Sequence, residues 1–141
     1  MTETFTITIP VRYRDLDTLG HVNNAVYATY LETARVEYFS TMYDDRSIMN
    51  QIVVASLSID FRRPITDIGE ITVDVETVEI GRTSLELSYV VSTADETAAT
   101  AETTIVILDE DTGKPTPVSE AIRNRIQEFH DENGPSAEKT E

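Results

Sequence analysis

The sequence contains no cysteine, which excludes disulfide bonds, metal sites with thiolate ligands and a cysteine nucleophile. It also lacks any apolar stretch near the roughly 18 residues that a membrane-spanning helix needs. No early apolar run follows a basic start, as it would in a secretory signal. We therefore expect a soluble, cytoplasmic protein with no membrane partner.

Basic residues are scarce, with nine arginines and two lysines against 26 aspartates and glutamates, and the net charge is −15. An acidic chain repels polyphosphate, so we expect no nucleic acid partner. The acidic residues are spread evenly along the chain, as in proteins of salt-loving organisms. Because molar salt shortens the Debye length to about 3 Å, it screens the repulsion between them. The composition therefore favours a halophilic protein over an ordinary acidic one.

The chain of 141 residues is long enough for one domain, which we place at residues 1–131, followed by an acidic tail at 132–141 that we expect to be disordered. Apolar and polar residues alternate in five segments, as in half-buried strands. These segments cover residues 5–13, 53–61, 71–80, 85–91 and 99–107. In the third segment the apolar phase jumps to Val78 and Ile80, which predicts a bulge.

A long helix is predicted from a cap at Asn23 or Asn24 to about Met42. Its apolar residues recur at steps of three and four and are Tyr27, Tyr30, Leu31, Ala34, Tyr38 and Met42. Ser119 is expected to cap a short second helix that ends near Phe129. A strand, a long helix, four strands and a short helix together indicate an α+β fold, with an antiparallel sheet covering the long helix.

Residues 11–39 combine the features of a reactive site. A strand-like run ends in Asp15 and Asp17, and the pair Asn23 and Asn24 then opens the long helix. A carboxylate beside the electropositive start of a helix suits attack on an acyl carbonyl. Asp17 can act as a nucleophile or as the general base for a water molecule, and backbone N–H groups near Asn24 can stabilise the oxyanion.

The same segment resembles the signature of the hotdog-fold thioesterases of the 4-hydroxybenzoyl-CoA thioesterase family, D-x-D-x-x-G-H-V-N-N-x-x-Y-x-x-Y-L-E-x-A-R. Thirteen positions match it in order: Asp15, Asp17, Gly20, His21, Val22, Asn23, Asn24, Tyr27, Tyr30, Leu31, Glu32, Ala34 and Arg35. The resemblance covers about residues 4–108. It implies a hotdog fold, in which a curved five-stranded antiparallel sheet wraps a long central helix, and hydrolysis of an acyl-CoA to a carboxylic acid and free coenzyme A.

The resemblance also implies roles for individual residues. In the branch of the family that uses an aspartate, the second acid of D-x-D is catalytic and an amide at the helix start polarises the thioester. These positions are Asp17 and Asn24 here. The other branch uses a carboxylate eight residues beyond the amide, which corresponds to Glu32, and we rank Asp17 first. Tyr27 would border the acyl group.

An aspartate-rich loop before a helix more often serves only as a turn and a helix cap. A calcium loop is a further alternative, because Asp15, Asp17 and Gly20 occupy loop positions 1, 3 and 6. Leu19 and Val26 then stand at positions 5 and 12, where that loop needs oxygen ligands. No glycine-rich phosphate loop is present. We therefore expect neither a metal ion nor a cofactor.

Four further residues are candidates for the site. His21 could orient the thioester or a water, or only bond to nearby backbone. Asn23 could face the ligand, but capping is its commoner role. Arg62 and Arg63 close the second strand, and either could bind a phosphate of coenzyme A or form a surface salt bridge. Because strand neighbours point to opposite faces, we expect only one arginine to reach the ligand.

The sequence favours an acyl-CoA thioesterase that works as a homodimer or homotetramer. A single helix covers one face of the sheet, so the other face and the edge strand need partners or polar side chains. In the family that the chain resembles, two domains usually join their sheets edge to edge. Two alternatives stay open, a thioesterase acting on acyl carrier protein and a non-catalytic hotdog protein that binds acyl-CoA.

Overall fold

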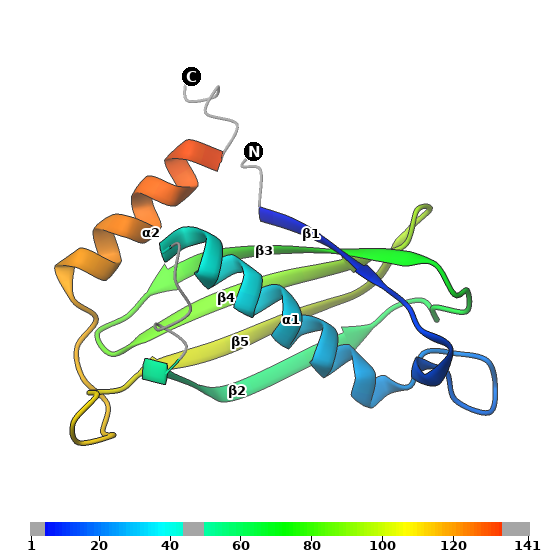
Figure 1. The fold of residues 1–141 in the computed structure, drawn as a ribbon, viewed down its shortest axis with the longest axis horizontal. Helices are drawn as coiled ribbons and strands as arrows, with labels where there is room; N and C mark the ends of the chain where they lie inside the picture. The colour runs from blue at the N-terminus through cyan, green and yellow to red at the C-terminus, as the bar shows by residue number, and fades with distance from the viewer. Residues whose placement is uncertain (1–4, 44–49, 134–141) are drawn as a thin grey trace.

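The computed structural model describes residues 5–43 and 50–133 and has the predicted order of elements (Figure 1). The strands are β1 (Phe5–Pro10), β2 (Ile52–Phe61), β3 (Glu70–Ile80), β4 (Ser84–Ser92) and β5 (Thr97–Ile107). The helices are α1 (Asn24–Tyr43), α2 (Glu120–Asn133) and a short 3-10 turn, η1 (Tyr13–Asp15).

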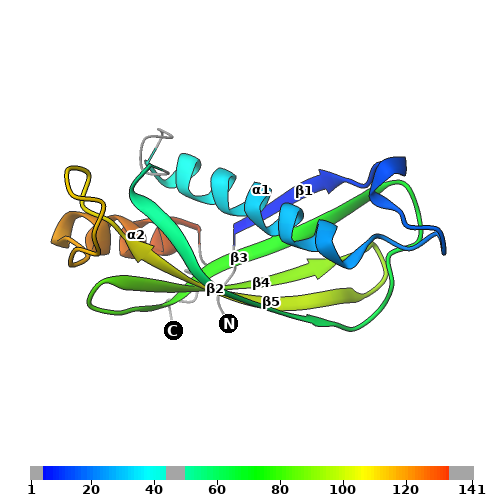
Figure 2. The ribbon, with the colours of Figure 1, turned by 90° about the horizontal axis from the view of Figure 1, so that it is seen from below.

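The five strands form one antiparallel sheet in the order β1-β3-β4-β5-β2. Helix α1 lies across one face of this sheet, and α2 lies at the end where α1 finishes (Figure 2). This is the α+β hotdog architecture that the resemblance implied. None of the described helices is long and apolar enough to cross a membrane.

The core lies between α1 and the inner face of the sheet. All six apolar residues predicted to form the buried stripe of α1 are buried, and so is Phe39. They pack against alternate residues of the central strands, which are Ile71, Val73, Val75, Leu85, Leu87, Tyr89, Val91, Ala99, Ile105 and Ile107. Burial of this stripe, rather than intrinsic helix propensity, is what holds α1 in place.

The sheet has three register shifts, one of them between Val91 and Ser92 at the end of β4, and the other two bear on the predicted strand phases. In β3 the pairing with β4 shifts between Thr77 and Glu79, which confirms the bulge predicted around Val78. In β2 the pairing with β5 shifts between Val54 and Ser56, which the sequence did not indicate. The uniform alternation predicted for β2 was therefore wrong. Because a bulge inserts one residue, Val54 and not Val53 lies on the same face as Leu57.

The first strand is shorter than predicted. It ends at Pro10, although the Val11 N–H still donates to the Gly69 carbonyl at 2.8 Å. The chain then enters η1, and the Tyr13 side chain is 80% exposed instead of facing the core. The prediction of a strand through Tyr13 was wrong because a tight turn, rather than further pairing, follows Val11.

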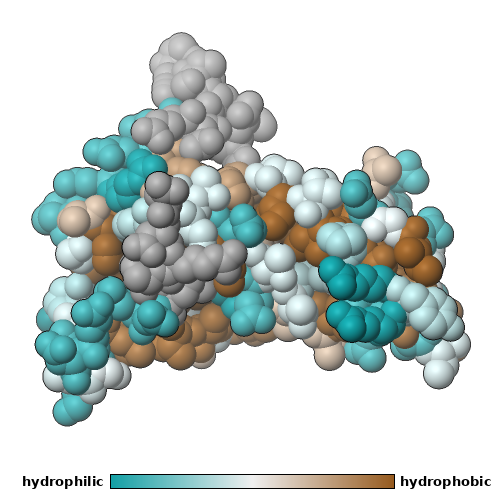
Figure 3. Space-filling model, viewed as in Figure 1, coloured by the Kyte–Doolittle hydropathy of each residue, from teal (hydrophilic) through white to brown (hydrophobic). Residues whose placement is uncertain are grey.

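The outer face of the sheet carries mostly polar side chains, including Thr72, Asp74, Glu86, Ser88, Thr100 and Glu102. That face can therefore meet water without a partner. The free edge of β2 differs, because Val53, Val54, Leu57 and Phe61 are 38–47% exposed there. Apolar surface runs along this lower margin of the molecule in Figure 3.

Helix α2 begins as predicted, since the Ser119 hydroxyl accepts the Ile122 N–H at 3.1 Å. It continues to Asn133, four residues beyond the predicted end at Phe129. Ile126 and Phe129 are its buried side chains. The remainder of the predicted tail, residues 134–141, lies outside the described residues.

Candidate functional site

A cleft of about 560 Å³ opens where the loop before α1, the first turn of α1 and the end of β2 meet. Its lining residues are Asp17, His21, Val22, Asn23, Asn24, Tyr27, Phe61, Arg62, Arg63 and Pro64. The fold thus brings together seven of the eight site residues that the sequence singled out. The eighth, Glu32, does not line this cleft.

Asp17 presents one held oxygen and one open oxygen. Its Oδ1 accepts the backbone N–H groups of Leu19 at 2.8 Å and His21 at 3.1 Å. These two bonds lower the pKa of Asp17 below its usual range, so the carboxylate is ionised at neutral pH. Among the described residues, Oδ2 has no hydrogen-bond donor, so it is available to a ligand or to water.

The loop that holds Asp17 closes on itself. The Asp17 N–H donates to the His21 carbonyl at 2.7 Å, and the Gly20 N–H donates to the Asp17 carbonyl at 3.0 Å. Gly20 has a φ of 80°, in the left-handed region that glycine adopts at little cost. The loop is therefore a compact turn that fixes the direction of the Asp17 side chain.

The start of α1 leaves one amide free. Asn23 is the cap, because its Oδ1 accepts the Ala25 N–H at 2.8 Å and its carbonyl accepts the Val26 N–H at 2.9 Å. Between them, the Asn24 N–H has no acceptor in the described part of the chain. Free N–H groups at a helix start attract negative charge. The cleft therefore contains a carboxylate oxygen and a backbone donor, the two groups that acyl transfer requires.

Asp15 has partners of a different kind. Its Oδ2 accepts the Arg12 N–H at 2.9 Å and the Tyr30 hydroxyl at 2.8 Å, and it does not line the cleft. Asp15 Oδ2 is thus bonded within the protein, whereas Asp17 lines the cleft. The residues that the structure describes contain no group of three histidines or carboxylates placed to hold a metal ion.

One wall of the cleft is aromatic. The Tyr27 ring is 2% exposed and meets Phe61 edge-on, with 4.9 Å between the ring centroids. Burial raises the pKa of Tyr27. The sequence did not single out Phe61 as a site residue. Its position as the last apolar residue of β2, directly before the two arginines, was the signal available.

Both arginines line the cleft, and the expectation that only one of them reaches the ligand stays a prediction. The expectation assumed strand geometry, but β2 ends at Phe61. The N–H groups of Arg62 and Arg63 donate to the same Ala98 carbonyl, at 2.8 and 3.1 Å, so strand alternation is lost. The Arg63 Nε lies 3.7 Å from Glu96, and both side chains are about half exposed or more, which makes this salt bridge weak.

His21 and Glu32 occupy contrasting places. His21 lines the cleft and contributes its backbone N–H to Asp17. Glu32 is exposed on α1, eight residues beyond Asn24. The catalytic roles that the sequence predicted for both side chains stay predictions.

The chain is similar to known proteins in both sequence and fold. The sequence model of the thioesterase-like superfamily matches residues 11–126. A thioesterase from Thermus thermophilus, solved in complex with coenzyme A and zinc, is 42% identical, with 89% of this chain and 92% of that chain covered and a TM-score of 0.82. A protein from Bacillus stearothermophilus, described as a predicted thioesterase, is 27% identical, with 92% and 96% covered and a TM-score of 0.82.

Among curated proteins, the uncharacterized protein YsmA of Bacillus subtilis is 30% identical over 110 residues. The match covers 75% of this chain and 74% of that protein. The matched family segment includes the whole loop before α1, helix α1 and both arginines.

Proposed function

The chain belongs to the thioesterase-like superfamily and is a thioester hydrolase, and from this premise we propose that its substrate is an acyl-CoA, cleaved at the junction of Asp17 and Asn24. The observation that carries the proposal is the pairing, in one cleft, of an ionised carboxylate and an unpaired helix-start amide. The products are a carboxylic acid and the free thiol of coenzyme A.

The proposed chemistry follows from these two groups. Asp17 Oδ2 attacks the acyl carbon, giving an anhydride that water then cleaves, or it removes a proton from a water molecule that attacks the same carbon. In both routes negative charge develops on the carbonyl oxygen, which the Asn24 N–H and the start of α1 stabilise. The thiolate is a good leaving group, so no further acid is required.

The proposed place for the coenzyme is the arginine side of the cleft. Arg62 and Arg63 are exposed at its mouth, and a guanidinium binds phosphate through paired hydrogen bonds. The Tyr27 and Phe61 wall is the apolar surface available to the acyl group. A relative of 42% identity was solved with coenzyme A bound, which supports this choice of substrate class.

The decisive experiment compares Asp17→Asn with Glu32→Gln on short, medium and aromatic acyl-CoA substrates. We expect Asp17→Asn to lower kcat about 10²- to 10⁴-fold while Tm changes little, because the loss falls on the reacting group. Glu32→Gln should retain activity. The reverse pattern would transfer the catalytic role to Glu32, and tight acyl-CoA binding without turnover would indicate a binding protein.

Parallel assays with acyl carrier protein thioesters test the choice of carrier. That protein is acidic, so the net charge of −15 should disfavour it unless Arg62 and Arg63 provide a local contact. Faster turnover of the protein-bound thioester than of the matching acyl-CoA would reverse our preference.

We also propose a homodimer or homotetramer built on the free edge of β2. Within the described residues β2 pairs only with β5, and its exposed apolar side chains fit an interface better than water. Joining two copies through β2 would bring a second chain close to the cleft. Leu57→Lys, at a side chain 44% exposed, should yield monomers in light scattering, whereas Val78→Lys, at a side chain 51% exposed on β3, should not.

The charge supports a further proposal, that the protein works in the cytoplasm of a halophile. Because molar KCl screens repulsion among the acidic residues, Tm should rise strongly between dilute buffer and molar KCl. A flat response in a thermal melt series would remove this interpretation.

A further inference from the structure

Asp17 belongs to a turn whose internal bonds do not fix its placement relative to α1. Residues 17–21 bond among themselves, through the Asp17 carboxylate and backbone. At its base the turn is closed by the bridge between Leu16 and Val22. The angle between this turn and the helix that carries Asn24 therefore depends on contacts made outside the turn.

Asp15 makes these contacts at the base of the turn. Its Oδ2 accepts the N–H of Arg12, which is the cap of η1. The same oxygen accepts the Tyr30 hydroxyl at 2.8 Å, and the Asp15 carbonyl accepts the Asn23 N–H at 2.9 Å. One residue thus connects the cap of η1, the cap of α1 and the second turn of α1.

Tyr30 is a firm attachment point. Its side chain is 3% exposed, and its ring packs against Tyr27 at 6.2 Å between centroids. Burial, reinforced by the hydrogen bond to Asp15, raises the pKa of Tyr30 far above neutrality, so its hydroxyl remains a donor at any working pH. A hydroxyl held by a buried ring loses little further entropy when it bonds, which favours a persistent contact.

We propose that Asp15 and Tyr30 form a positioning pair that sets the Asp17 carboxylate against the Asn24 amide. This inference rests on the proposed function and assigns the pair no contact with substrate, since neither residue lines the cleft. The pair acts through Asp17 and Asn24, because it couples the base of the Asp17 turn to the helix that presents the Asn24 N–H. Precise placement of reacting groups has a large effect on rate, since a displacement of about 1 Å can cost 10²-fold.

The test uses two conservative variants, Tyr30→Phe and Asp15→Asn. Tyr30→Phe removes the donor of the bond, and Asp15→Asn replaces the charged acceptor with a weaker neutral one, while both keep the shape of the side chain. We expect kcat to fall about 10- to 10²-fold with KM nearly unchanged, because alignment is lost and binding is not. The double variant should be no worse than the more impaired single variant, because both substitutions act on the same contact.

The matched control is Tyr89→Phe, which removes another buried tyrosine hydroxyl, bonded to Thr103 Oγ1 at 2.8 Å. It should lower Tm about as much as Tyr30→Phe and leave kcat at the wild-type value. If Tyr30→Phe loses no more activity than this control, the positioning role is refuted. An inactive Asp15→Asn beside a fully active Tyr30→Phe would also refute the pair and make Asp15 the acting group.

A readout without substrate separates this inference from the proposed function. Amide hydrogen exchange at Asn23 and Leu19 should accelerate in Tyr30→Phe and stay unchanged in Tyr89→Phe, because only the first variant loosens the base of the turn. Equal exchange in both variants would contradict the pair even if the enzyme is active. If the wild-type protein hydrolyses no acyl-CoA but Tyr30→Phe still shows the expected faster exchange, only the proposed substrate is refuted.

Discussion

The two ends of helix α1 differ in how their backbone groups are hydrogen-bonded. At its start Asn24 lines the cleft, and its N–H has no acceptor among the described residues. At its end the Met42 carbonyl accepts the Arg125 Nε–H at 2.6 Å, so a cation from α2 closes the negative end of the helix. The same helix therefore has an N–H available to a ligand at its start and a carbonyl that is hydrogen-bonded within the protein at its end.

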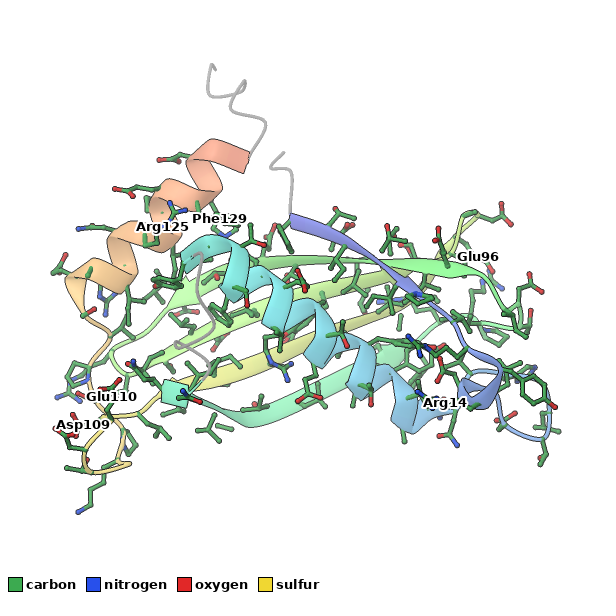
Figure 4. The ribbon with its side chains drawn as sticks, viewed as in Figure 1. Arg14, Glu96, Asp109, Glu110, Arg125 and Phe129 are labelled. Atoms are coloured by element: carbon green, nitrogen blue, oxygen red, sulfur yellow. The ribbon has the colours of Figure 1, made fainter. Side chains whose placement is uncertain are left out.

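Aromatic side chains from β1 and α2 pack around the end of α1. Phe129 of α2 lies against Phe5 and Tyr38, with ring centroids 5.9 and 5.8 Å apart, and Arg125 stacks over Phe129 (Figure 4). The Tyr38 hydroxyl bonds to Thr77 and to His130 Nε2, both at 2.7 Å. The comparison teaches that the start of α1 keeps a backbone donor unpaired, whereas the Met42 carbonyl and the Tyr38 hydroxyl toward its end are paired. The pairing at that end is not complete, since the buried hydroxyls of Ser40 and Tyr43 have no hydrogen-bond partner among the described residues.

The largest expected difference between the two ends of α1 is in the stability of two phenylalanine variants. Phe129→Ala should lower the free energy of unfolding by about 3–5 kcal/mol, because its buried ring leaves a cavity. Its kcat should match the wild type at temperatures where it is folded. Phe61→Ala, at a side chain 47% exposed, should lose less stability and raise KM. Denaturant titrations and steady-state kinetics test both variants. Equal losses of stability in Phe129→Ala and Phe61→Ala would contradict the difference between the two ends of α1.

The helix caps allow a smaller and closely matched comparison. Asn23→Ala and Ser119→Ala should each cost about 1 kcal/mol, because each removes one side-chain bond to a first-turn amide. Only Asn23→Ala should also lower kcat, because it frees the turn that carries the Asn24 amide. An equal loss of activity in Ser119→Ala would mean that the cleft is sensitive to any loss of stability.

The smallest expected effect is a pH dependence of the stability, caused by His130 of α2 near the end of α1. Burial lowers the pKa of His130 below its usual value, although the charges of Glu76 and Asp131 oppose the shift. Its Nε2 accepts bonds from the Tyr38 hydroxyl and the Thr77 N–H, which requires the neutral ring. The contribution of these bonds to the free energy of unfolding is therefore complete above pH about 6.5, the pKa of histidine in the unfolded chain. It declines as the pH falls toward the lower pKa of His130 in the folded protein.

His130→Gln should remove this part of the pH dependence. The measurement is the free energy of unfolding from pH 7.5 to 5.5 for both proteins, compared as a difference so that carboxylates common to both cancel. Parallel curves for the two proteins would mean that protonation of His130 does not weaken the attachment of α2.

Much of the fold followed from the sequence because its signals are local. The steps of three and four in α1, the phase jump at Val78 and the Ser119 cap each depend on neighbouring residues alone. The phase of β2 could not be predicted in this way. The bulge after Val54 is defined by its pairing with β5, a strand some fifty residues later.

The candidate site shows the same difference between local and long-range signals. Asp17, Asn23 and Asn24 were visible because turn, cap and helix start are consecutive in the chain. Phe61 and the joint placement of both arginines were not, because the end of β2 meets the start of α1 only in three dimensions. The bond from Asp15 to Tyr30 spans fifteen residues and could not be read from spacing.

By itself the sequence determined the order of elements, the buried stripe of α1 and the carboxylate-turn-cap motif, since each arises from periodicity or from contacts between near neighbours. Only the tertiary structure decided which strand end completes the cleft, that both arginines line it and that Tyr30 bonds to Asp15. These depend on hydrogen bonds and burial between distant segments, which form only when the sheet closes around the helix.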